Sequence, residues 1–432
     1  MSFVKSKVAS KSISPIRWVP STYFAMGLPY VTISIVALIM LNDFGMPNDK
    51  ITFWTSLLVL PWSLKPFFSV VMELVGSKKM YVVVTELICS VVFGLVAFSM
   101  PLPDFYSLVI ALLAVMAFSG SMHDIAGDGL YMAELSTDQQ SKFVGWQGAF
   151  YNLAKILANG GLIYLAGIMS RQIGIIKSWM VIMVICAVLM AVIALYHMAV
   201  MPSGKRNEHQ EKKTFSAGMA ELWLVIKTFF QKKYIWYYLI FIILYRFAEG
   251  LATKVAPLFL KAPVEQGGIG LTNEQYGLIY GTGGALAFIV GSILGGYYIS
   301  RFGLRKVLFS LALIFNVPFV VYLLLALFRP TSLWWIGSGV VFEYFTYGFG
   351  FVGLTLFMMQ QIAPGKYQMA HYAFATSIMN LGVMLPGMIS GKLSLMLGYR
   401  DFFIVVMIAT IPALILTYFV PFTHKEAQET VK

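Results

Sequence analysis

Long apolar runs divide the chain into segments of membrane-spanning length. An α-helix rises about 1.5 Å per residue, so roughly 20 residues cross a hydrocarbon core of about 30 Å. Twelve runs meet this length: residues 18–41, 51–74, 80–100, 105–132, 144–169, 179–201, 235–258, 275–299, 307–328, 333–361, 367–391 and 402–420. The pattern predicts an all-α membrane protein with twelve transmembrane helices.

The longest polar stretch, residues 203–233, separates these runs into two groups of six. It ends in an amphipathic segment, residues 215–233. The basic residues of this segment, together with Trp223, Phe229 and Phe230, suit a membrane surface. We therefore expect an N-terminal six-helix half over 1–202, a cytoplasmic linker over 203–233, a C-terminal half over 234–422 and a cytoplasmic tail over 423–432.

A weak internal repeat supports the division. The segment that begins at Gly45 and opens the second run resembles the one that begins at Gly270 and opens the eighth. At the other end of the same runs, Gly76-Ser-Lys-Lys79 corresponds to Gly303-Leu-Arg-Lys306. The two matches are offset by 225 and 227 residues. A nearly constant offset at both ends of one helix indicates a duplicated unit, and so two pseudo-symmetric halves.

Composition agrees with burial in lipid. The chain is 59% hydrophobic and 12% charged, whereas soluble domains are about a quarter charged. The net charge of +12 would suggest nucleic acid in a soluble protein, but here the basic residues gather in the short segments between apolar runs. Most of them fall on the cytoplasmic side if the N-terminus lies inside, although Arg171 and Lys177 do not. We expect both termini in the cytoplasm and no nucleic-acid partner.

Nothing in the sequence predicts a metal or another cofactor. The two cysteines, Cys89 and Cys186, both fall inside apolar runs and have no metal-ligand spacing. The lipid bilayer is an expected partner, and we expect a monomer.

The loop after the eighth run carries a family likeness. Gly296-Tyr-Tyr-Ile-Ser-Arg-Phe-Gly-Leu-Arg-Lys306 resembles the loop signature of the major facilitator superfamily, with Ser300 in place of the usual Asp. The first-half copy keeps an acid at Glu73 but has Leu74 where the family has a basic residue. The resemblance implies the superfamily's fold and transport by alternating access over the whole chain.

These two loops are candidates for a conformational latch. A tight glycine turn places cations near the negative C-terminal end of a helix, and an acid can pair with a neighbouring helix. The residues concerned are Glu73, Gly76, Lys78, Arg301, Gly303 and Arg305. The alternative is that the basic residues merely follow the positive-inside rule.

Two first-half segments are similar to a narrower group. Leu60-Pro-Trp-Ser-Leu-Lys-Pro-Phe-Phe68 and His123-Asp-Ile-Ala-Gly-Asp-Gly129 resemble the AmpG-type muropeptide permeases, which in turn resemble eukaryotic acetyl-CoA transporters. His123 replaces a common Gln, and the loop after Glu73 is short. The resemblance implies proton-linked import of cell-wall recycling products, chiefly anhydro-muropeptides and the disaccharide GlcNAc-anhydroMurNAc, across a bacterial inner membrane.

Ionisable side chains within membrane spans are costly, so each is a functional hypothesis. Lys155, Arg246 and Glu343 all lie near the midplane by residue count, and Glu249 shares a helix face with Arg246, with which it can pair. In the superfamily's fold spans 1, 4, 7 and 10 surround a central cavity, with 2, 5, 8 and 11 beside them. The resemblance therefore implies that these four groups line one chamber.

Asp124 and Asp128 share one face of the fourth span at i, i+4. Two nearby carboxylates in a partly dry cavity raise each other's proton affinity, because both cannot ionise cheaply. We expect them to couple a proton to transport, with His123 as a relay and with Glu249 and Glu343 as further carriers. Alternatively, one aspartate only pairs with Lys155 or a loop cation and holds helices together.

Substrate contacts are predicted on four spans. An amino sugar needs amides, hydroxyls and aromatic faces, and a peptide carboxylate needs a cation. The residues that offer these groups are Gln147, Tyr151, Lys155, Arg246, Tyr347 and Asn380. Of the other intramembrane charges, Lys65 and Lys254 are expected to snorkel towards the membrane surface, and Glu86 to tie the third span to a neighbour.

Three alternatives remain beside muropeptide symport. The first is a symporter for simple sugars or amino sugars such as N-acetylmuramic acid, whose lactyl group also carries a negative charge. A membrane-embedded enzyme would have to use His123, Asp124 and Asp128, which are too few ligands for a metal at this spacing. A non-transporting scaffold is the third.

Overall fold

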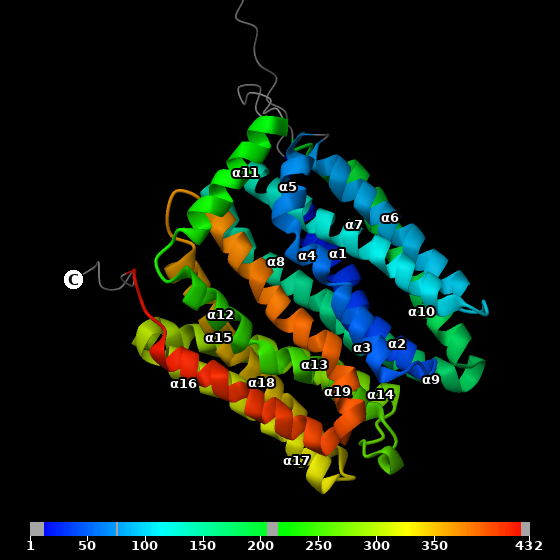
Figure 1. Ribbon diagram of the computed structural model, residues 1–432. Helices are drawn as coiled ribbons and strands as arrows, with labels where there is room; N and C mark the ends of the chain where they lie inside the picture. Colours follow the sequence, from blue (N-terminus) through cyan, green and yellow to red (C-terminus); the bar gives the residue numbers. More distant parts are fainter. Residues whose placement is uncertain (1–12, 75–76, 205–214, 425–432) are drawn as a thin grey trace, which may run out of the picture.

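The computed structural model describes residues 13–74, 77–204 and 215–424, and within these ranges every regular element is a helix (Figure 1). The helices form two bundles, one coloured blue to green and the other green to red in Figure 1. The linker helix α11 (Phe215–Phe230) lies between them in sequence and occupies the predicted amphipathic segment.

The N-terminal half contains spans 1 to 6, and spans 1, 2 and 5 each consist of several helical segments. Span 1 consists of η1 (Pro15–Arg17), α1 (Val19–Val31), the π-helical turn η2 (Thr32–Val36) and α2 (Ala37–Asp43). Span 2 is α3 (Asn48–Leu57), α4 (Leu60–Ser63) and α5 (Lys65–Leu74). The others are α6 (Lys78–Ser99), α7 (Phe105–Glu134), then α8 (Thr137–Lys155), η3 (Ile156–Leu162) and α9 (Ile163–Ile173), and finally α10 (Ile175–Val200).

The C-terminal half contains spans 7 to 12. Span 7 is α12 (Ile235–Tyr245) and α13 (Phe247–Lys261), followed by the short turn η4 (Val264–Gln266). Span 8 is α14 (Asn273–Tyr276), η5 (Gly277–Gly284) and α15 (Ala285–Phe302), and span 9 is α16 (Leu304–Asn316), η6 (Val317–Phe319) and α17 (Val320–Phe328). Span 10 is α18 (Leu333–Phe357) with η7 (Met358–Ile362), and spans 11 and 12 form α19 (Gln368–Phe419).

Among the described residues, nine helices are long and apolar enough to cross a membrane unbroken. One of them, α19, joins two spans across Gly398, whose φ of 73° is not helical. Span 2 is interrupted at Leu58 and Leu64, and span 7 at Arg246, so these two spans are not continuous helices. Counting α19 as two spans and adding spans 2 and 7 gives twelve spans among the described residues. The predicted twelve helices in two six-helix halves are therefore confirmed.

The outward faces of the helices suit a hydrocarbon solvent. Large apolar side chains are exposed along them, including Phe98, Leu195 and Ile408. Trp334 and Trp335, at the start of α18, are 88% and 74% exposed. Tryptophan is enriched at membrane–water interfaces, where its ring can be both buried and wet. The exposed apolar surface is therefore the lipid-facing surface of a multi-span protein.

The two halves meet firmly at the end opposite α11 (Figure 1). There Asp43 of α2 forms an ion pair with Lys261 of α13 and accepts a hydrogen bond from Asn273 at 2.5 Å. Arg171 of α9 pairs with Glu274 of α14 at 2.8 Å. We call this the closed end, and the end that carries α11 the linker end.

Glycine allows the backbones to approach at the closed end. The π-helical turns η3 and η5 pack against each other across the two halves. A Cβ atom at Gly281 would overlap the backbone of Asn159 and Gly160. Only a residue without a side chain fits there, so the glycine-rich sequence of span 8 serves close packing between the halves.

Candidate substrate cavity

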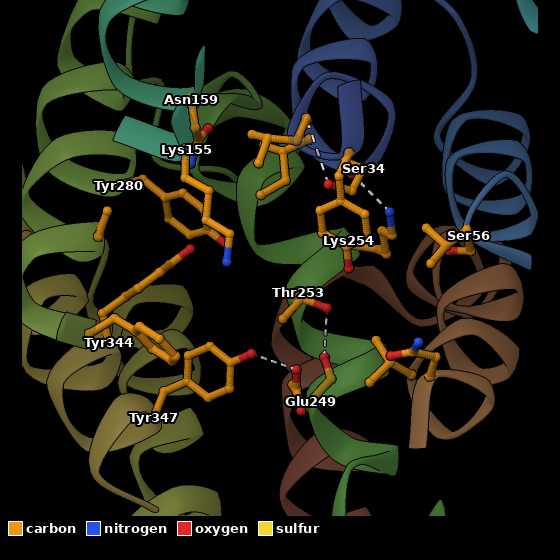
Figure 2. A pocket seen from close by; sticks show the side chains of 18 of the residues that line it. Ser34, Ser56, Lys155, Asn159, Glu249, Thr253, Lys254, Tyr280, Tyr344 and Tyr347 are labelled. Carbon is orange, nitrogen blue, oxygen red and sulfur yellow. Dashed lines mark hydrogen bonds between the residues drawn. The ribbon is translucent and has the colours of Figure 1, made fainter. Parts of the chain in front are cut away.

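A cavity lies between the two halves and is lined by residues of both (Figure 2). Its polar lining comes from spans 1, 2, 5, 7, 8, 10 and 11. The polar and aromatic residues that line it are Tyr30, Ser34, Ser56, Asn152, Lys155, Asn159, Arg246, Glu249, Thr253, Lys254, Tyr280, Phe288, Tyr344, Tyr347 and Asn380. The predicted substrate residues Lys155, Arg246, Tyr347 and Asn380 are thus brought together, although they come from four different spans.

Arg246 and Glu249 form a pair within the cavity wall, as their spacing predicts. The guanidinium Nε donates to Glu249 Oε2 at 2.6 Å, and Nη2 donates to Oε1. Tyr347 donates its hydroxyl to the same Oε1 at 2.8 Å (Figure 2). Arg246 sits at the break between α12 and α13, where its φ of −104° turns the chain out of the helix. The break aims both side chains at the cavity, and the pair neutralises itself.

Lys155 enters the cavity from α8, at the start of the π-helical turn η3 (Figure 2). Its ammonium lies 4.8 Å from the centre of the Tyr151 ring, a cation–π contact. No carboxylate among the described residues forms an ion pair with it. Gln147 and Tyr151, predicted with it, do not line the cavity. Gln147 instead donates to the Tyr23 hydroxyl at 2.8 Å.

Asp124 and Asp128 lie outside the cavity lining and have separate partners. Asp124 Oδ2 accepts from Lys65 Nζ at 2.7 Å and from Trp62 Nε1 at 2.8 Å. Asp128 accepts from the Tyr23 hydroxyl at 2.7 Å. The cation beside Asp124 therefore comes from span 2, and neither Lys155 nor a loop cation is its partner. The expectation that Lys65 snorkels is wrong, because its ammonium is directed to this carboxylate.

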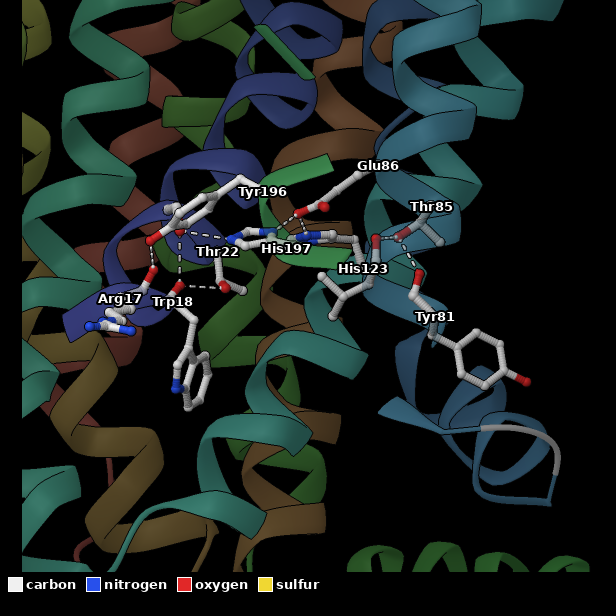
Figure 3. A network of polar contacts seen from close by, with 11 residues as sticks. Arg17, Trp18, Thr22, Tyr81, Thr85, Glu86, His123, Tyr196 and His197 are labelled. Carbon is white, nitrogen blue, oxygen red and sulfur yellow. Dashed lines mark hydrogen bonds and ion pairs between the residues drawn. The ribbon is translucent and has the colours of Figure 1, made fainter. Parts of the chain in front are cut away.

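His123 belongs to a different polar cluster (Figure 3). Its Nε2 lies 3.0 Å from Glu86 Oε1, and His197 Nδ1 lies 2.8 Å from the same oxygen. The other nitrogen of His197 lies 2.7 Å from Ser21 Oγ. Glu86 and both histidines are at most 2% exposed. The cluster joins spans 1, 3, 4 and 6, so Glu86 ties span 3 to two neighbours, and His123 bonds to neither aspartate.

We expect Glu86→Leu to lower the free energy of unfolding by about 2 kcal/mol, because it leaves buried imidazole donors without an acceptor. Thermal unfolding of the purified protein in detergent measures the change. Glu86→Gln is the matched control, since its carbonyl oxygen can still accept from both rings and should preserve most of the stability. Equal losses in the two variants would contradict a role through these hydrogen bonds.

Glu343 is placed differently from the prediction. Its carboxylate is buried beside span 9, where Oε2 accepts from the Tyr322 hydroxyl at 2.9 Å. It does not line the cavity, so the expectation of one chamber holds for Lys155, Arg246 and Glu249 but is wrong for Glu343. The neighbours Tyr344 and Tyr347 on the same helix line the cavity instead. The rotation of α18 about its axis turns Glu343 away from the cavity. Residue depth, on which the prediction was based, does not say which way a side chain points.

The second latch loop is described in full, and the first only in part. Gly303 ends α15 with a φ of 83°, a conformation that favours glycine. The Arg301 guanidinium lies 5.6 Å from the Phe302 ring centre, and that of Arg305 lies 5.9 Å from Phe422. Lys78 opens α6. Gly76 and the side chain of Glu73 lie outside the described residues, so the latch stays a prediction.

Lys254 is the charged cavity residue that sequence reasoning missed. It was expected to snorkel outward, but it is 7% exposed and its ammonium donates to Ser34 O at 2.9 Å and Thr55 O at 3.1 Å. The expectation was wrong because the nearest acceptors are carbonyls of the other half. A signal existed: a lysine within an apolar span is costly and indicates a function by default.

The chain is similar to known transporters over nearly all of its length. The model of the Major Facilitator Superfamily matches residues 21–362. The putative transporter AmpG 4 of Rickettsia felis is 24% identical over 407 residues, covering 90% of this chain and 92% of that protein. The anhydromuropeptide permease of Escherichia coli K12 is 22% identical over 406 residues, covering 91% of this chain and 77% of the permease.

A solved structure shares the fold. A bacterial homolog of the human lysosomal transporter Spinster, in an inward-facing and unoccupied conformation, matches with a TM-score of 0.69 and 14% identity, over 95% of this chain and 96% of that one. The family model covers well over half of the chain, and the twelve-helix architecture agrees with it. The chain therefore belongs to the Major Facilitator Superfamily and is a membrane transporter rather than an enzyme.

Proposed function

We propose that this transporter imports cell-wall recycling products, anhydro-muropeptides and GlcNAc-anhydroMurNAc, across a bacterial inner membrane by proton symport and alternating access. The observation that carries the proposal is the composition of the cavity wall. It combines the ammonium of Lys155 with three amide side chains, Asn152, Asn159 and Asn380, and with several tyrosines. Amides and hydroxyls suit an amino sugar, aromatic faces suit its ring, and a cation suits a carboxylate. A relative named as an anhydromuropeptide permease points to the same substrate class.

The arrangement of the halves suits the orientation that the basic residues predict. With the linker end in the cytoplasm, the closed end seals the cavity from the outside through Asp43, Lys261, Arg171 and Glu274. Import then requires these contacts to break so that substrate can enter, and to form again before it leaves towards the cytoplasm. Both termini lie inside in this proposal.

The proton-coupling proposal centres on the Asp124–Lys65 pair and on Asp128. Protonation of Asp124 removes its attraction to Lys65, which joins spans 2 and 4, so one proton can change the contact between two helices. Asp128 is connected through Tyr23 to Gln147 on span 5. Glu249 in the cavity and Glu343 behind it remain further candidates for the carrier, and His123 is the weakest because it bonds to Glu86.

N-Acetylmuramic acid is the second candidate substrate. Its lactyl carboxylate could pair with Lys155, and the same amides would take its acetamido group. A simple neutral sugar would leave the lysine without a partner, so the cavity favours an acidic amino sugar over it.

Uptake by purified protein in proteoliposomes tests the proposal. Radiolabelled GlcNAc-anhydroMurNAc is offered with an inward proton gradient, with and without an uncoupler, and peptide-bearing and peptide-free ligands compete. We expect gradient-dependent accumulation that muropeptides inhibit. Competition by N-acetylmuramic acid alone would favour the second candidate, and binding without uptake would indicate a non-transporting scaffold.

Lys155→Ala should weaken binding of acidic ligands about tenfold or more and leave binding of neutral amino sugars nearly unaffected. Only an acidic ligand loses a hydrogen-bonded charge pair with Lys155 in this variant. Binding of each ligand is measured by calorimetry or scintillation proximity. Lys155→Arg keeps the charge and should retain most of the preference. Unchanged binding of both ligand types in Lys155→Ala would refute the assignment.

A further inference from the structure

The charges that line the cavity do not balance. The lining contains three cationic side chains, Lys155, Arg246 and Lys254, but one carboxylate, Glu249. Glu249 is fully engaged with Arg246 and Tyr347. Two ammonium groups are therefore left, Lys155 from the N-terminal half and Lys254 from the C-terminal half. They enter the cavity from different sides (Figure 2).

Lys254 is held by neutral acceptors of the opposite half. Its ammonium reaches Ser34 O in the π-helical turn η2 and both oxygens of Thr55 in α3, at 3.1 Å for the carbonyl and 3.4 Å for the hydroxyl. The Thr55 carbonyl is free to accept because α3 ends two residues later, and the amide of Val59, its usual partner, bonds to Ser56 O instead. Lys254 thus caps the C-terminal end of α3, the negative end of that helix.

Capping alone does not account for a lysine at this depth. Carbonyl oxygens carry only partial charges, and a neutral donor or a water molecule could satisfy them. Among the described residues no carboxylate pairs with Lys254. A buried charge without an ionic partner is expensive, and a side chain that lines a ligand cavity can receive that partner from the ligand.

We propose that Lys254 is the second anion-binding point of the cavity, so that the transporter prefers substrates with two separate anionic groups, one held by Lys155 and the other by Lys254. This inference rests on the proposed function and narrows its substrate class from acidic amino sugars to those with a second carboxylate. Because the two lysines belong to different halves, such a ligand bridges the halves, whereas a ligand with one acidic group engages only one of them.

A matched pair of ligands tests the inference. Anhydro-muramyl-L-alanyl-D-glutamate carries two carboxylates, and the corresponding D-isoglutamine compound differs by one carboxamide in place of a carboxylate. Binding of both is measured on the wild-type protein and on Lys254→Gln, which keeps hydrogen-bond donors for the carbonyls of Ser34 and Thr55 but removes the charge. We expect the wild type to bind the diacid about tenfold more tightly or better, and the variant to lose that preference.

Lys50→Gln is the control variant. It removes the same kind of charge from an exposed position of α3, the helix that Lys254 caps, and Lys50 does not line the cavity. The preference for the diacid should survive in it, and Lys254→Arg should restore much of the preference. Equal wild-type affinity for both ligands, or an undiminished preference in Lys254→Gln, would overturn the inference while leaving muropeptide transport intact. Failure of the wild type to bind either ligand would instead contradict the proposed function itself.

Discussion

Asp124→Asn is expected to abolish proton-driven accumulation of substrate while leaving exchange of substrate across the membrane. An asparagine cannot bind and release a proton, and it leaves Lys65 without its ionic partner. With a gradient of about 2 pH units and no membrane potential, one coupled proton supports roughly 100-fold accumulation. The ratio of internal to external substrate in proteoliposomes should therefore fall from that range to about one.

Asp104→Asn supplies the matched control for this loss. Asp104 is an exposed carboxylate just before the same helix, α7, and makes no capping hydrogen bond there. Its replacement should leave the accumulation ratio unchanged. Asp128→Asn is measured alongside, because the two aspartates share the proposed role. Full accumulation in both Asp124→Asn and Asp128→Asn would rule out coupling through this pair and direct attention to Glu249 and Glu343.

Arg246→Met should destabilise the protein by about 3–5 kcal/mol, the largest structural effect that we expect from one substitution. It leaves Glu249, which is 1% exposed, as a buried charge with only the Tyr347 hydroxyl as a side-chain partner. Breaking one member of a buried pair costs more than removing both. The double variant Arg246→Met/Glu249→Met should therefore regain much of the stability, which thermal unfolding in detergent can measure.

Arg400→Met is the comparison at the surface. Arg400 pairs with Asp401 at 2.7 Å, but both side chains are largely exposed, and such pairs contribute little. The unfolding temperature should barely change in this variant. If the double variant in the cavity is as unstable as Arg246→Met, burial of an unpaired carboxylate is not the cause of the loss.

The sequence was sufficient for the architecture because lipid imposes simple requirements. A helix must hide its backbone and expose apolar side chains, so length and hydropathy located all twelve spans. Local spacing was sufficient for Arg246 and Glu249, three residues apart on one chain segment. It also indicated that Glu86 ties span 3 to a neighbour, since a buried carboxylate needs a partner.

Spacing could not identify partners on other spans. Asp124 pairs with Lys65, 59 residues away, and Lys254 reaches Ser34 and Thr55 in the opposite half. Glu343 has the right depth but the wrong rotation, and it bonds to Tyr322 behind the cavity wall. The π-helical turns at η2, η3 and η5 shift the helix faces by part of a turn, so an ideal α-helical period misassigns side chains beyond them.

By itself, the sequence determined that the chain is a two-half membrane protein with costly charges at the midplane. Hydropathy and repeat spacing depend only on the order of residues along the chain, so no structure is needed to detect them. Only the tertiary structure decided which of those charges share a cavity, which neutralise one another and which stay without a partner. Those outcomes depend on helix rotation, on breaks such as the one at Arg246, and on contacts between halves. The physical reason is that the cost of a buried charge is set by its neighbours in space, and these come from distant parts of the chain.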